Sequence, residues 1–125
     1  MKKSTAEWAK KAEADRLIAR KSGRSKTPLH DGVCFHCQQC VEKYLKAIIE
    51  EIGLPIPRTH DLDRLALLLL PHYPEFRSVR RGLVFLTTFA VATRYPGEDA
   101  NKRQAKAALR WSEQIREMSR TILKI

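Results

Sequence analysis

Apolar residues recur every three or four positions along most of this chain, which is the period of an amphipathic helix. The clearest stripe lies within residues 33–52 and covers an arc of about 100°. It consists of Cys34, Cys37, Val41, Tyr44, Leu45, Ile48 and Ile52. The same period predicts helices over residues 5–20, between Thr59 and Pro71, over 75–92 and over 99–124. Because no segment alternates strictly, we expect an all-α fold, an up-and-down antiparallel bundle of four to five helices.

The ends of these helices are marked by residues that cap or stop a helix. Ser4 followed by Glu7 is the spacing of a capping box at the start of the first helix. Asp31 is expected to cap the second helix and Thr59 the third. In the last two helices we predict that Leu83 and Trp111 are buried. The segments between helices are short, which favours a single domain over residues 1–125.

Three cysteines follow one another with the spacing C-x2-C-x2-C, at Cys34, Cys37 and Cys40. Cys34 and Cys37 fall on the apolar stripe, where a free cysteine behaves as a small hydrophobic residue. The alternative is a metal site with His30 and His36 as extra ligands, but the fourth cysteine of an iron–sulfur motif is missing. We therefore expect no metal and no cofactor. An odd number of cysteines is also typical of a reducing, cytoplasmic compartment.

The net charge of +10 adds a possible partner to this picture. Basic residues outnumber acidic ones by nine to four over residues 1–32 and by seven to three over residues 99–125. Such a field attracts polyanions, so nucleic acid, a nucleotide or an acidic protein are candidate partners, whereas solubility is the simpler explanation. The longest apolar run, residues 65–70, is too short to cross a membrane, and the first residues lack the apolar core of a signal peptide.

The second predicted helix carries a polar stripe opposite its apolar one: Gln39, Glu42, Lys43, Lys46 and Glu50. Glu42 to Lys46 and Lys46 to Glu50 are spaced for ion pairs along a helix, each contributing about 0.3 kcal/mol. On spacing alone, this stripe is interpreted as a solvated, ion-paired helix surface. The last helix has a basic outer face with two alternatives, a solvated surface or a contact for phosphates.

Three motifs taken together resemble the HEPN family of nucleotide-binding domains, over about residues 5–124. The first is Q-x2-E-K-x-L-K-A, which begins at Gln39, and the second is T-H-D-L, which begins at Thr59. The third is R-Y-P, formed by residues 94–96. The resemblance implies a helical bundle that is commonly a homodimer. It also implies a minimal nucleotidyltransferase as the partner in a toxin–antitoxin-like pair and, in several branches, a metal-independent ribonuclease.

The ribonuclease branches carry an Arg-x4-6-His motif on a late helix, and this chain departs from that pattern. Its only pair at that spacing is Arg24 and His30, in the predicted first loop. We therefore interpret the chain as a non-catalytic interaction module that contacts a nucleotide or RNA, with catalytic residues unknown. The alternative is a ribonuclease with a site built from His60, Arg94 and either His36 or Asp61.

Six residues are the candidates for binding a nucleotide or RNA: Lys43, Lys46, His60, Asp61, Arg94 and Tyr95. His60 and Asp61 open a predicted helix, whose N-terminus favours an anion. The Arg94 guanidinium can grip a phosphate, and the Tyr95 ring can stack on a base. Lys43 and Lys46 add positive charge if the second helix passes nearby. For His60, Arg94 and Tyr95, ordinary structural roles at helix ends remain the alternative.

Overall fold

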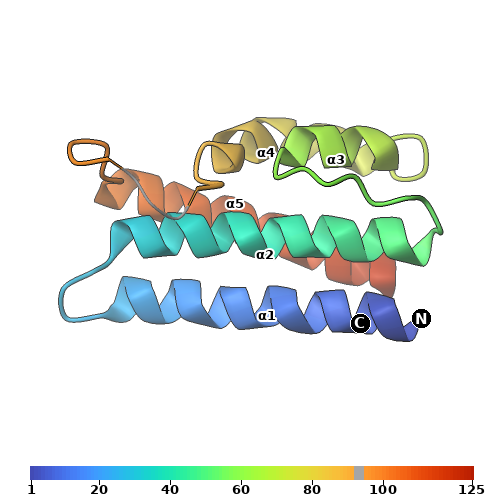
Figure 1. The fold of residues 1–125 in the computed structure, drawn as a ribbon, viewed down its shortest axis with the longest axis horizontal. Coiled ribbons are helices and arrows are strands. Elements are labelled where there is room, and N and C mark those ends of the chain that lie inside the picture. Colours follow the sequence, from blue (N-terminus) through green and yellow to red (C-terminus); the bar gives the residue numbers. More distant parts are fainter. Residues whose placement is uncertain (92–94) are drawn as a thin grey trace.

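The computed structural model describes residues 1–91 and 95–125, and all of its regular elements are helical (Figure 1). The helices are α1 (Lys3–Arg24), α2 (His30–Glu51), α3 (Leu62–Leu69), the 3-10 helix η1 (Pro74–Val79), α4 (Arg80–Thr87) and α5 (Lys102–Leu123). The described part of the chain contains no strand. The predicted all-α helical bundle is confirmed.

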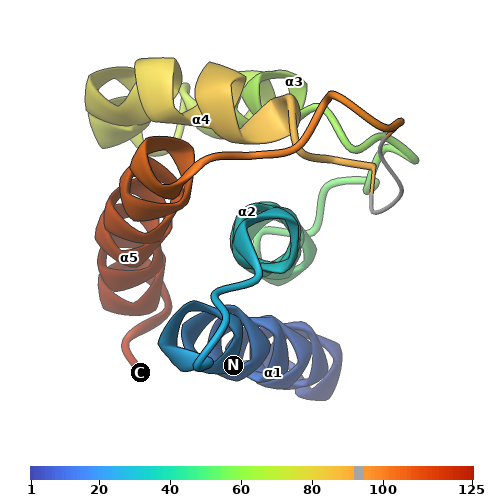
Figure 2. The same cartoon turned by 90° about the vertical axis from the view of Figure 1, so that its left-hand side faces the viewer.

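The second helix is the centre of the bundle. Figure 2 shows α2 nearly end-on, with α1 below it, α5 to one side and the α3–α4 layer above. Because these elements cover α2 on several sides, its polar stripe is largely enclosed: Glu42 is only 4% exposed and Lys46 only 9%. The interpretation of the stripe as a solvated surface is therefore wrong for these two residues. The Glu42–Lys46 ion pair does form, at 3.1 Å, whereas Glu50 accepts a hydrogen bond from Ser4 of α1.

Ser4 and Asp31 do not cap the helices that they were predicted to cap. Each forms a hydrogen bond with a segment that is distant in the chain. α1 begins at Lys3 without a side-chain cap, because the Ser4 hydroxyl donates to Glu50 at 2.8 Å and does not cap its own helix. α2 begins one residue before Asp31, so Asp31 lies in its first turn. The Asp31 carboxylate accepts from the backbone N–H of Ala100 at 2.7 Å, which ties the start of α2 to the segment before α5.

The later helices also begin and end at other residues than the pattern predicts. Asp61, and not Thr59, caps α3, by accepting from the backbone N–H groups of Asp63 and Arg64. The predicted helix over residues 75–92 is divided into η1 and α4 and ends at Thr87. α5 begins at Lys102, after a capping box formed by Asn101 and Gln104. Asparagine is among the residues preferred at the N-cap of a helix.

The core brings α4 close to α5. Leu83 is fully buried, as predicted, whereas Trp111 is only partly buried. The Trp111 ring lies over Gly82, where an added Cβ would come within 2.3 Å of two ring carbons. Glycine at this position therefore permits the close approach of the two helices.

The three cysteines are buried on α2, and none of them forms a disulfide. Burial raises the pKa of Cys37 to about 11 and raises the pKa of Cys40 further. Both thiols are therefore neutral near pH 7 and behave as small core residues, which the apolar stripe predicted for Cys37 but not for Cys40. Among residues 1–91 and 95–125, no group of three or more His, Cys, Asp or Glu side chains is placed to hold a metal ion.

Candidate functional site

The buried carboxylate of Glu42 joins two sequence motifs. Its Oε1 lies 2.8 Å from Nδ1 of His60 and accepts from Nε2 of Gln38 at 3.2 Å, and its Oε2 accepts from Nζ of Lys46. Gln38 also donates to the backbone carbonyl of His60 at 3.1 Å, so α2 holds both the ring and the main chain of His60. We call Gln38, Glu42, Lys46 and His60 the Glu42 cluster.

Within the Glu42 cluster, the part that reaches solvent is His60. Its side chain is 68% exposed, whereas that of Glu42 is only 6% exposed. Because a carboxylate can only accept a hydrogen bond, Nδ1 of His60 is the donor, and Nε2 is left for an external partner. A buried acid that fixes the orientation of an exposed imidazole is an arrangement that serves both ligand binding and proton transfer.

Lys46 is the enclosed cation of the cluster. Its Nζ pairs with Glu42 and lies 5.8 Å from the centroid of the Trp8 ring, on α1. This cation–π contact and the ion pair account for a charge at so low an exposure. The positive charge of Lys46 is directed at Glu42, so it stabilises the acid that positions His60.

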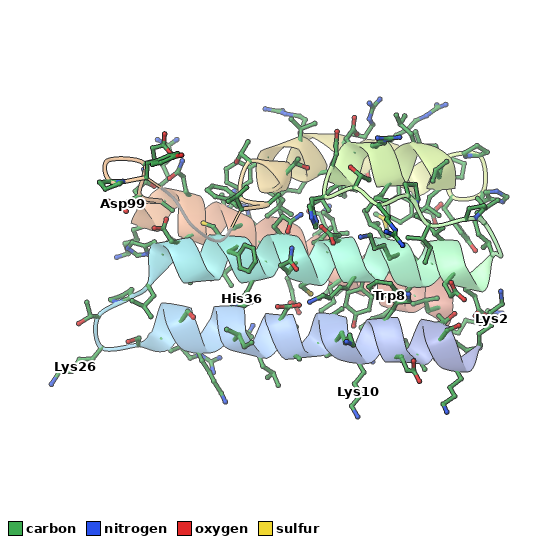
Figure 3. The ribbon with its side chains drawn as sticks, viewed as in Figure 1. Lys2, Trp8, Lys10, Lys26, His36 and Asp99 are labelled. Carbon is green, nitrogen blue, oxygen red and sulfur yellow. The ribbon has the colours of Figure 1, made fainter. Side chains whose placement is uncertain are left out.

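Lys43 lies on α2 three residues before Lys46, but it interacts with α1 and not with the Glu42 cluster. Its Nζ donates to Asp15 of α1, and Nδ1 of His36 lies 2.7 Å from the other oxygen of that carboxylate. Asp15 is buried, although the sequence analysis does not name it. The signal that could have identified it is an acid placed between Ala12 and Ala19, on the face of α1 that packs against the core. Figure 3 labels His36 on the side of α2 that faces α1.

The other candidates are placed as follows. Asp61 uses its side chain to cap α3, next to His60. Tyr95 is largely exposed, and Arg94 lies outside the described residues. Of the residues predicted to converge, Lys46 lies with His60 in the Glu42 cluster, whereas Lys43 pairs with Asp15; convergence of Arg94 stays a prediction. Exposed arginines that the sequence analysis did not single out, Arg58 and Arg64, flank His60 in the chain.

A second polar group connects α1 to α5 on another side of α2. Arg116 donates two hydrogen bonds to Glu13, at 2.7 and 2.8 Å, and Tyr44 donates its hydroxyl to the same carboxylate at 2.5 Å. The hydrogen bonds from Arg116, opposed in part by burial, lower the pKa of Glu13 from 4.5 to about 2. Burial and the hydrogen bond to Glu13 raise the pKa of Tyr44 to about 12.

The lowered pKa of Glu13 predicts a pH dependence of stability. Because the folded-state pKa lies below the unfolded value, the stabilisation is present above about pH 4.5 and is lost as the pH falls through about 2. We expect Glu13→Gln to flatten the dependence of the unfolding free energy on pH between about 5 and 2. Urea denaturation at several pH values measures this, with Glu7→Gln on the exposed side of α1 as the control. Equal pH dependence in both variants would contradict the assignment.

No described helix combines the length and the apolar character needed to cross a membrane.

The sequence of this chain matches a known protein family. The family model of the HEPN domain matches residues 5–122 of this 125-residue chain. The chain belongs to the HEPN domain family. No curated protein and no solved structure matches it significantly. In this HEPN domain, the Q-x2-E-K-x-L-K-A and T-H-D-L motifs meet at the contact between Glu42 and His60.

Proposed function

We propose that this HEPN domain is a non-catalytic interaction module that contacts a nucleotide or RNA at His60. The observation that carries the proposal is the pairing of an exposed imidazole with a buried carboxylate, 2.8 Å apart. Because Glu42 and Gln38 fix the ring and its backbone, little side-chain freedom is lost when a ligand binds. Nε2 can accept from an N–H of a base edge when the ring is neutral and can donate to a phosphate when the ring is protonated, and the face of the ring can stack on a base.

Charge near His60 supports an anionic ligand. Arg58 and Arg64 are exposed, and among the described residues neither forms an ion pair with a carboxylate. Arg64 lies in the first turns of α3, so its guanidinium is available close to the helix end that His60 precedes. Guanidinium groups bind phosphates through two parallel hydrogen bonds, which suits a nucleotide or an RNA backbone.

The same module is proposed to act in the cytoplasm, as a homodimer or with a minimal nucleotidyltransferase in a toxin–antitoxin-like pair. Exposed apolar side chains on the outer helices, Leu67 of α3 and Val84 of α4, support a protein partner. Beside Val84, a shallow pocket is lined by Arg80, Arg81 and Phe85, so this surface offers both apolar contact and positive charge. Cys34, Cys37 and Cys40 form no disulfide, which agrees with a reducing compartment.

A binding titration tests the proposed ligand site. We expect His60→Ala to weaken the binding of a short single-stranded RNA or of a nucleotide about tenfold or more, which corresponds to the loss of one hydrogen bond to a charged group. His72→Ala is the matched control, since His72 is also exposed but is not part of the Glu42 cluster. Equal affinities of the wild type and both variants would exclude His60 as a contact.

A ribonuclease is the second candidate function, and the Glu42–His60 pair is the observation that favours it. An imidazole oriented by an acid is suited to proton transfer near neutral pH. Against it, neither α4 nor α5 contains a histidine, so the Arg-x4-6-His motif is missing from the late helices. Incubation of the purified chain with the RNA used for binding decides between the two: cleavage that His60→Ala abolishes would replace the proposal of a non-catalytic module.

A further inference from the structure

A cavity of about 220 Å³ lies between α1 and α5, above Cys37 of α2, and four arginines are among its lining residues. Arg16, Arg20 and Arg24 follow one another at four-residue spacing along α1, and Glu113 and Arg116 face them from α5. We call the space bounded by Cys37 and these five side chains the arginine groove. It lies where α1 and α5 flank α2 in Figure 2, whereas the Glu42 cluster joins α2 to the segment before α3.

The charges of the groove are unbalanced. Four guanidinium groups line it, and the one carboxylate among its lining residues is Glu113. Arg16 occupies both oxygens of Glu113, at 2.9 and 3.0 Å, and Arg116 shares one of them at 3.2 Å. These bonds hold two of the guanidinium groups in place. The carboxylate of Glu113 is therefore already paired with Arg16 and Arg116.

Arg20 and Arg24 differ from the two arginines that Glu113 holds. Among the described residues, no carboxylate forms an ion pair with either side chain. Like charges four residues apart repel one another along a helix, so Arg16, Arg20 and Arg24 repel one another along α1. An anion between α1 and α5 would remove this repulsion and would gain charge-assisted hydrogen bonds.

The floor of the groove is compatible with an anion. Cys37 and Cys40 are buried there, and because burial keeps both thiols protonated, they bring no negative charge. Leu109 and Ala19 add apolar surface. The volume lies below the range of roughly 300–1,000 Å³ that drug-sized ligands occupy. The groove therefore suits a phosphate group and the first atoms attached to it better than a whole large ligand.

We propose that the arginine groove binds the phosphomonoester end of a nucleotide or of an RNA strand. Arg20 and Arg24 contact the phosphate, while Arg16, held by Glu113, and Arg116, held by Glu13 and Glu113, form the wall behind it. A guanidinium can hold a dianionic phosphate through paired hydrogen bonds, which an isolated surface lysine does not provide. This site is separate from the Glu42 cluster, and the proposal does not depend on the function proposed for His60.

Isothermal titration of the full chain with AMP, inorganic phosphate and adenosine tests the proposal. The variant Arg20→Gln/Arg24→Gln removes the two unpaired guanidinium groups and leaves the ion pairs of Arg16 and Arg116 intact. Lys10→Gln/Lys21→Gln is the matched control, because it removes the same charge from the same helix outside the groove. Figure 3 shows Lys10 pointing away from the bundle. Thermal melts establish that both variants are folded.

We expect AMP and inorganic phosphate to bind the wild type and adenosine not to bind. Affinity for AMP should fall tenfold or more in the arginine variant and stay within twofold in the lysine variant. A short RNA with and without a 5′-phosphate identifies the source: tighter binding of the phosphorylated RNA than of AMP indicates an RNA end, and the reverse indicates a free nucleotide. Equal losses in both double variants, equal binding of adenosine, or no binding of any phosphate probe would overturn the proposal.

Discussion

Replacing Glu42 by alanine is expected to lower the free energy of unfolding by about 3–5 kcal/mol, the usual cost of removing one partner from a buried ion pair. Glu42 accepts from Lys46 at 3.1 Å, and both side chains are almost enclosed. The variant leaves the Lys46 ammonium without its counter-charge and takes from Gln38 one of its acceptors. Urea denaturation near pH 7 measures the loss.

Two further variants make this prediction specific. Glu50→Ala removes an acid from the same helix at a more exposed position and should cost much less. The double variant Glu42→Leu/Lys46→Met replaces the ion pair by apolar side chains and should recover most of the stability, because buried pairs are often no better than well-packed apolar residues. A loss of stability below about 1 kcal/mol for Glu42→Ala is typical of an exposed ion pair and would contradict the prediction for Glu42.

The second large effect is expected for Leu83→Ala in α4. Leu83 is fully buried between the outer helices and the core, so the shorter side chain leaves a cavity and should lower the free energy of unfolding by about 2–5 kcal/mol. Its neighbour Val84 is 55% exposed, and Val84→Ala should change stability by less than about 0.5 kcal/mol. Similar losses in both variants would contradict the burial of Leu83 and the exposure of Val84.

The helical period was sufficient to predict the fold class. Apolar positions three and four residues apart define which face of each helix packs inward, and Leu45, Ile48 and Leu83 are fully buried accordingly. Helix ends were predicted less well, because a capping residue can satisfy another segment instead. Ser4 donates to Glu50 and Asp31 accepts from Ala100, and both partners are distant in the chain. Such contacts are decided by tertiary packing.

The candidate site was predicted in part. Lys46 and His60 lie in one cluster, but Lys43 pairs with Asp15 of α1 instead. The sequence could not separate these outcomes, since an i,i+4 pair such as Glu42 and Lys46 has the same spacing on a solvated surface as under a second helix. What covers a polar stripe depends on the other elements, and here α1 and the segment before α3 cover it.

The buried thiols of α2 give this molecule a built-in probe of its own motion. Cys37 and Cys40 form the floor of the arginine groove and are only 2% exposed, so a thiol reagent too large for the groove reaches them only when the helices around them separate. Their labelling rate under native conditions therefore reports how often the seam between α1 and α5 opens, in the same way that amide hydrogen exchange reports local unfolding. Cys34, fully buried nearer the start of α2, reports on opening at that end of the same helix. The spacing C-x2-C-x2-C thus places three chemical reporters along the central helix.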